Sequence, residues 1–181
     1  VRGVQEALSF DATGSQDTSS AYLTAFGADG FSLGNSVTVN KNTITYAAWN
    51  WKIGGDSGSS NTNGSINTTS TSVNSDAGIS ISTYTGNATS GATVGHGLSK
   101  APEMIINKCR STAGNWAVYH AGNTSAPETE YLELETNAAT ADIENIWNDQ
   151  APTSSVFYLG NNASVNGNGE TFVTYCFHSV E

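Results

Sequence analysis

The alternation of apolar and polar residues is the main structural signal along this chain. Residues 78–84 alternate strictly, residues 115–120 alternate again, and residues 104–109 form a nearly continuous apolar run. Alternation predicts strands with one buried face, and a continuous run predicts a central strand buried on both faces. A helical pattern is confined to residues 143–147. We therefore expect an all-β protein in which helix makes up less than about 10% of the residues.

An internal repeat connects two distant parts of the chain. Residues 31–51 (FSLGNSVTVNKNTITYAAWNW) align without a gap with residues 157–177 (FYLGNNASVNGNGETFVTYCF), and eight of these 21 pairs are identical. Each copy has the pattern of a hairpin, with a short strand, an Asn-rich turn and an aromatic strand. The aromatic residues Tyr46, Trp49 and Trp51 align with aromatic residues in the second copy. Because duplicated core positions keep their type, we expect Trp49 and Trp51 to be buried.

The repeat indicates the arrangement of the whole chain. Residues 7–10 (ALSF) resemble residues 131–134 (YLEL) at nearly the same offset. Two equivalent hairpins are most simply related strands of an antiparallel, jelly-roll-like β-sandwich. We expect residues 1–181 to form one sandwich domain, a fragment of a longer chain because it begins with Val. Residues 52–74 are rich in Gly, Ser, Thr and Asn, which predicts a polar surface loop.

Composition narrows the classes of function. The net charge is −10 with only six basic residues, so binding to nucleic acid is not expected. No apolar run has the length of a membrane-spanning helix, which argues against membrane insertion. Charged residues are only 12% of the chain, and a polar, uncharged surface suits an extracellular protein. Cys109 and Cys176 lie in apolar runs, so we expect two buried free thiols rather than a disulfide framework.

His96 and Trp147 are the candidate binding residues. His96 lies in the motif Gly95-His96-Gly97-Leu98, where it could act as a ligand or a pH-sensitive contact. Alternatively, the two glycines shape a tight turn that the imidazole caps through a hydrogen bond. Trp147 is the tryptophan least constrained by the repeat, so we expect it at the surface, where it could stack on a sugar ring.

Acidic residues offer weaker candidates for chemistry. Glu133 and Glu135 share one face of a predicted strand, as paired carboxylates of a glycosidase could, but charges on an exposed edge strand explain them as well. Asp11, Asp17 and Asp29 lie in turn-like stretches without the ligand pattern of a Ca²⁺ loop. The three histidines also lack metal-ligand spacing. We therefore predict no catalytic residue, no metal site and no cofactor.

The order of several sequence blocks resembles a domain of phage tail-fibre and virion structural proteins found in phages of marine bacteria. The resemblance covers about residues 30–180. The blocks that carry it are TYAAWNWKIGG, NTNGSINTTSTSVNSDAGISISTYTG, VGHGLSKAPEMIINKCRS, NWAVYH and APTSSVFYLGNNASVNGNGETFVTYCF. The resemblance implies a location on the virion surface and a role at the host surface, and it supplies no catalytic residues.

The sequence leaves three functions to compare. The leading expectation is a non-enzymatic tail-fibre module for host attachment, whose partners are a cell-surface glycan or protein and other virion proteins. The alternative is a purely structural virion adaptor or decoration domain. A polysaccharide depolymerase is the third, and no convincing constellation of catalytic residues supports it. Because fibres are usually threefold, we expect a homo-oligomer, with a trimer favoured.

Overall fold

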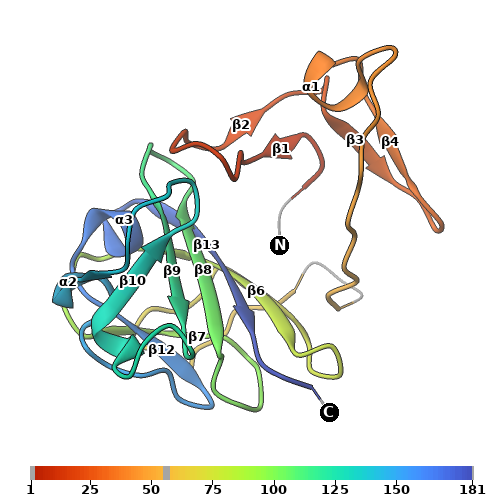
Figure 1. The fold of residues 1–181 in the computed structure, drawn as a ribbon. Helices are drawn as coiled ribbons and strands as arrows, with labels where there is room; N and C mark the ends of the chain where they lie inside the picture. Colours follow the sequence, from red (N-terminus) through yellow and green to blue (C-terminus); the bar gives the residue numbers. More distant parts are fainter. Residues whose placement is uncertain (1–2, 55–57, 181) are drawn as a thin grey trace.

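A seven-stranded antiparallel sheet forms the centre of the computed structural model, which describes residues 3–54 and 58–180 (Figure 1). The strand order is β11-β10-β9-β8-β13-β6-β5. In chain order these strands are β5 (Ser70–Asn74), β6 (Ile79–Thr85), β8 (Met104–Cys109), β9 (Trp116–His120), β10 (Glu130–Glu133), β11 (Ala141–Asp142) and β13 (Thr171–Phe177). Helix accounts for 9% of the structure. The predicted all-β antiparallel sandwich is confirmed.

A smaller sheet forms the second layer of the sandwich. It pairs β7 (Ala92–Gly95) with β12 (Val156–Leu159) in antiparallel register. Side chains of both layers meet in one buried cluster, in which Val94 and Phe157 of the small sheet pack with Phe172 of the large one. Removing these apolar surfaces from water is the main force that holds the two layers together.

Single helical turns connect several strands. They are α1 (Val37–Asn40), α2 (Glu144–Trp147), α3 (Ala163–Asn166) and the 3₁₀ turn η1 (Pro127–Thr129). The side chains of Ser36 and Asn162 precede α1 and α3, and each accepts a hydrogen bond from the backbone N–H two residues further on. Such N-caps satisfy backbone donors that a short helix leaves without partners.

β13 is an interior strand of the large sheet. It pairs with β6 on one side and with β8 on the other. Phe172 of β13 stacks on Tyr84 with 5.1 Å between ring centroids. The Tyr84 hydroxyl donates to the Val165 carbonyl at 2.6 Å and accepts from the Asn107 amide at 2.6 Å. Burial raises the pKa of Tyr84. This neutral phenol therefore links β6 to β8 and to the helical turn α3 through two hydrogen bonds.

The N-terminal segment contributes two small hairpins outside the sandwich. β1 (Glu6–Ala7) pairs with β2 (Asp17–Thr18), and β3 (Leu23–Phe26) pairs with β4 (Phe31–Leu33). Figure 1 shows β3, β4 and α1 standing away from the seven-stranded sheet. Residues 44–54 contain no strand and cross back towards the edge at β5.

Residues 52–74 are not a loop throughout, which corrects the expectation from their composition. β5 occupies the last five of these residues, and Ile66 forms a bridge with Val94 while being only 7% exposed. The buried Thr71 hydroxyl shares a hydrogen bond with the Ser82 hydroxyl at 3.0 Å. Hydroxyl side chains can therefore fill a strand interior when they bond to one another. Residues 55–57 lie outside the described residues.

The repeat also differs from the expected pair of hairpins. β12 and β13 belong to different sheets, because the intervening turn is the helical turn α3, which redirects the chain. The expectation that Trp49 and Trp51 are buried is wrong, since they are 78% and 68% exposed. Their counterparts in β13, Tyr175 and Phe177, are half-buried.

Both cysteines are buried free thiols, as the sequence predicts. Burial raises the pKa of the Cys176 thiol, which keeps it protonated. Within the described residues, no helix is both long enough and apolar enough to cross a membrane.

Candidate functional site

An aromatic groove lies between the N-terminal segment and the seven-stranded sheet. Its cavity volume is about 1050 Å³. The N-terminal side is formed by the tip of the β3–β4 hairpin, with Phe26 and Phe31, and by Trp49 and Trp51. Three of these aromatic side chains are more than half exposed, and Phe31 is 38% exposed. A concentration of exposed aromatic side chains on a protein of low charge is typical of an interaction surface.

The floor of the groove comes from the outer face of the large sheet. Ser72 of β5, Ile81 of β6 and Tyr175 of β13 line it. Hydrogen bonds from side chains of β5 to backbone carbonyls hold the end of the N-terminal segment beside this face. The Ser72 hydroxyl donates to the Ile53 carbonyl at 2.6 Å. The Asn74 amide likewise donates to the Lys52 carbonyl at 2.9 Å. One side of the groove is therefore held by hydrogen bonds from β5 to residues 52–53, and the other side consists of exposed aromatic side chains.

The groove has few charged groups. Asp29 and Lys52 are its only ionisable side chains apart from tyrosine among the described lining residues. Flat aromatic faces with scattered backbone amides can pack against the apolar surface of a polypeptide or against a sugar ring. No nucleophile–base pair is among these described lining residues.

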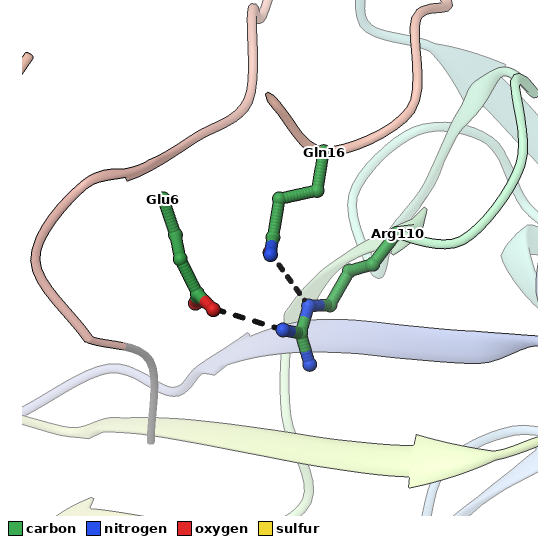
Figure 2. Close-up of polar contacts among 3 residues, drawn as sticks. All are labelled: Glu6, Gln16 and Arg110. Carbon is green, nitrogen blue, oxygen red and sulfur yellow. Dashed lines mark hydrogen bonds and ion pairs between the residues drawn. The ribbon is translucent and has the colours of Figure 1, made fainter. Parts of the chain in front are cut away.

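A polar contact joins the N-terminal segment to the sandwich of the seven-stranded sheet and the β7–β12 sheet, which we call the complete sandwich (Figure 2). The Arg110 guanidinium, just after β8, donates through Nε to the Gln16 side-chain carbonyl at 2.8 Å and lies 3.6 Å from the Glu6 carboxylate. The backbone joins the same contact, because the Gln16 N–H donates to the Arg110 carbonyl at 2.8 Å. One arginine thus bridges both strands of the β1–β2 hairpin to the sheet.

A buried aromatic contact extends this attachment. Trp116 is fully buried, and Phe10 stacks on it with 4.6 Å between centroids. The indole N–H donates to the Ser9 carbonyl at 3.0 Å. Lys108 Nζ donates to the carbonyls of Thr13 at 3.1 Å and Gly114 at 2.9 Å. Burial lowers the pKa of Lys108, and its carbonyl acceptors replace lost hydration. We call the contacts of Arg110, Lys108 and Trp116 with residues 6–16 the docking contact.

His96 has a structural position. It is fully buried, and its Nδ1 accepts from the Leu98 backbone N–H at 3.1 Å. Nε2 lies 3.1 Å from the Thr153 carbonyl, and burial lowers the pKa of the imidazole. Gly97 has φ +75°, a conformation that favours glycine. This is the capped turn that the sequence offered as the alternative, and the role of His96 as an exposed ligand has no support.

Trp147 is not a surface aromatic, which corrects the expectation for it. Its side chain is 3% exposed and lies in the main core, edge-on to Tyr119 at 6.3 Å between centroids. α2 turns Trp147 inward together with Ile146. The repeat predicts Trp49 and Trp51 in the core and leaves Trp147 for the surface, and the exposed fractions of these side chains are the reverse. The exposure of Trp49 and Trp51 depends on missing neighbours, which no local pattern reveals.

The acidic candidates have partners within the fold. The Glu133 carboxylate accepts from the Asn115 amide and the Tyr131 hydroxyl, and Glu135 accepts from the Trp116 backbone N–H at 3.0 Å. These two carboxylates hold strand ends together. In the part of the chain that the structure describes, no group of three or more His, Cys, Asp or Glu side chains could hold a metal ion. Asp11, Asp17 and Asp29 therefore belong to no such group.

Comparisons with known proteins give one result. A family model described as a domain of unknown function (DUF7483) matches residues 1–181. No curated protein and no solved structure matches the chain significantly.

Proposed function

We propose that this chain, which belongs to the DUF7483 family, is a non-catalytic module of a virion appendage of the tail-fibre type that serves attachment to the host surface. The sequence blocks over residues 30–180 that resemble tail-fibre domains support the location on the virion. The low share of charged residues, 12%, suits an exterior particle surface. The partners of the proposal are a cell-surface glycan or protein and neighbouring virion proteins.

The observation that carries this proposal is the docking contact, which joins the N-terminal segment to the complete sandwich. The N-terminal segment repeats part of the complete sandwich and is fastened to it through Arg110, Lys108 and Trp116. Units that contact only their neighbours build elongated arrays, and such arrays present extended binding surfaces. An appendage that spans from particle to host needs this kind of construction.

The polar residues with catalytic potential support a non-catalytic role through their contacts. Both ring nitrogens of His96 have partners in the fold, and Glu133 and Glu135 bind side chains and backbone of neighbouring strands. Residues that hold a fold together in this way cannot easily move to accept a substrate.

The attachment proposal is tested on the intact appendage. The full-length protein that carries this chain should bind immobilised host envelope, and antibodies raised against the chain should label the appendage in electron micrographs of particles. Incubation with envelope polysaccharide should release no reducing sugar above background. Labelling of another part of the particle, or sugar release, would contradict the proposal.

A purely structural adaptor is the second candidate, and the docking contact favours it because it already joins two units. The double variant Trp49→Ser with Trp51→Ser separates the two roles. In a direct attachment role, envelope binding falls while the assembled appendage keeps its length. In the adaptor role, the appendage fails to assemble or shortens. Both tryptophans are highly exposed, so the variant should leave the complete sandwich folded.

Assembly as a homotrimer is part of the proposal. With only 22 charged residues in 181, the surface has few like charges to repel neighbouring copies. Threefold symmetry would place three weak sites side by side, and the gain in avidity reaches about 10²–10⁴-fold without new contacts. Light scattering on the intact appendage protein should give the mass of three chains. A monomer at micromolar concentration would overturn this model of attachment.

A further inference from the structure

The pairs of strands at residues 6–18 and 130–142 have the same construction. In the first, Glu6 pairs with Thr18 and Ala7 with Asp17. In the second, β10 and β11 pair with the same register at an offset of 124 residues: Glu130 with Asp142, and Tyr131 with Ala141. The likeness of residues 7–10 to residues 131–134 is therefore structural.

The likeness continues through the next strand and helical turn. β4 and α1 occupy the positions of β12 and α3 at an offset of 126 residues. The Asn40 side-chain amide donates to the Gly34 carbonyl at 2.9 Å, and the Asn166 amide donates to the Gly160 carbonyl at 2.9 Å. A Cβ on either glycine would lie within 2.5 Å of another backbone segment. Both copies therefore need glycine and asparagine for the same local contacts.

The two copies differ in burial. Phe31 is 38% exposed, whereas its counterpart Phe157 is 1% exposed. Leu33 is 40% exposed, whereas Leu159 is fully buried. Tyr46 is 50% exposed, and the matching Phe172 is fully buried. The N-terminal copy thus exposes side chains that the C-terminal copy uses as its core. We call residues 3–53 the open half, and residues 125–180 the closed half.

Residues 58–124 cover the closed half. From this segment, β6 and β8 flank β13, β7 pairs with β12, and β9 pairs with β10. We call residues 58–124 the covering half. Among the described residues, the open half has no second covering half. Its β4 pairs with the local strand β3 instead, and residues 45–51, which match the whole of β13, form no strand.

We propose that the open half is the second half of a further sandwich unit, and that it binds a polypeptide segment of the same type as the covering half. This segment supplies strands on both sides of residues 45–51 and pairs with β4 in the way β7 pairs with β12. The exposed Phe31, Leu33 and Tyr46 then enter a core like that around Phe157, Leu159 and Phe172. This inference goes beyond the proposed function, because it holds wherever the chain is located.

The occupant follows from the number of halves. The described residues 3–54 and 58–180 contain two second halves, open and closed, but one covering half. A second copy of this chain also has two second halves and one covering half. When two copies associate, two of their four second halves therefore stay uncovered. The occupant is therefore an additional covering half, as in an array of repeated units. The docking contact would then be the junction between two successive units.

A fusion supplies this segment in a defined way. The β1–β2 pair and the β10–β11 pair are offset by 124 residues, so the position after Thr124 matches the start of the chain. A second copy of residues 54–124 is joined directly in front of residue 1 of the full chain. Amide hydrogen exchange of residues 45–51 is then compared in the fused and unfused proteins. We expect exchange at these amides to slow by at least about 100-fold, as for a central strand.

Two controls make the outcome decisive. The substitution Leu33→Asp should leave the unfused protein unchanged, because Leu33 is exposed there, and should abolish the new protection in the fusion. As a positive control, residues 1–53 of the fusion are replaced by a second copy of residues 125–180, the natural partner of the added segment. If this control is protected while the open half still exchanges fast, the proposal is overturned. Protection that appears in the unfused chain together with a dimer mass would overturn it in favour of self-association.

Discussion

The open and closed halves carry the same local sequence signals, yet only one of them is folded into a core. Both have a capped helical turn after a strand, a glycine at a close backbone approach and an asparagine that bonds to that glycine's carbonyl. These features form in both halves because they depend on neighbouring residues. Strand formation at residues 45–51 and at β13 differs, because a strand needs partners for its backbone N–H and C=O groups.

The largest expected difference between the halves lies at Phe172 and Tyr46. Phe172→Ala removes a fully buried ring that stacks on Tyr84, so it should lower the free energy of unfolding by about 3–5 kcal/mol. Tyr46→Ala removes a half-exposed side chain whose hydroxyl donates to the Val37 carbonyl and accepts from the Lys41 N–H, and should lower it by about 1 kcal/mol. Urea denaturation followed by circular dichroism measures both values. Equal losses for the two variants would mean that the open half already has a core.

The contrast explains how far the sequence alone could go. Alternation at residues 78–84 and the apolar run at 104–109 correctly predicted β6 and β8, because their burial pattern follows their own residues. The repeat was found from identities such as Phe31 with Phe157. Its meaning was missed for Trp49 and Trp51, since exposure depends on which strands cover a segment.

The candidate site was harder to predict than the fold. Trp147 is the tryptophan least constrained by the repeat, which predicts it at the surface, but α2 turns it into the core. The docking contact joins Arg110 to residues 94 and 104 positions away in the chain, and no spacing rule indicates such a pair. The weak likeness of residues 7–10 to 131–134 was the signal that could have revealed the open half.

Asn166 and Asn40 give a sharper comparison, because both make the same local hydrogen bond. The buried Asn166 side chain also donates to the Thr89 carbonyl at 3.0 Å and accepts from the Asn87 N–H at 2.9 Å. Asn166→Ala removes three hydrogen bonds of a buried side chain, including the one to the buried Gly160 carbonyl, and should cost about 2–3 kcal/mol. Asn40→Ala, on an exposed turn, should cost less than about 0.5 kcal/mol. Thermal unfolding of the two variants tests this, and a similar loss of Tm in both would contradict it.

Lys108 tests whether the docking contact joins the open half to the covering half. Lys108→Met keeps an unbranched aliphatic side chain but removes the ammonium group, which lies over the Trp116 ring and donates to the Thr13 carbonyl. We expect a loss of about 1 kcal/mol in local stability, which is about a fivefold faster hydrogen exchange at residues 12–16. Exchange in β13 should not change. As a matched control, the exposed Lys100→Met should affect neither region, and faster exchange in β13 would show that Lys108 supports the core instead.

The smallest expected effect is a pH dependence confined to the complete sandwich, because His96 lies in the covering half. Burial lowers the folded-state pKa of His96 below its ordinary value of 6.5, and the nearby His178 acts in the same direction. The unfolded chain therefore binds a proton more readily, so stability is fully present above pH 6.5 and decreases as the pH falls towards the folded-state pKa. Urea midpoints of the wild type should fall between pH 7 and pH 5, whereas His96→Asn should show a shallower decrease. Hydrogen exchange in the open half, corrected for its intrinsic pH dependence, should not follow this titration. If the open half loosened in parallel with β13, its folding would be coupled to the complete unit, and the comparison between the halves would fail.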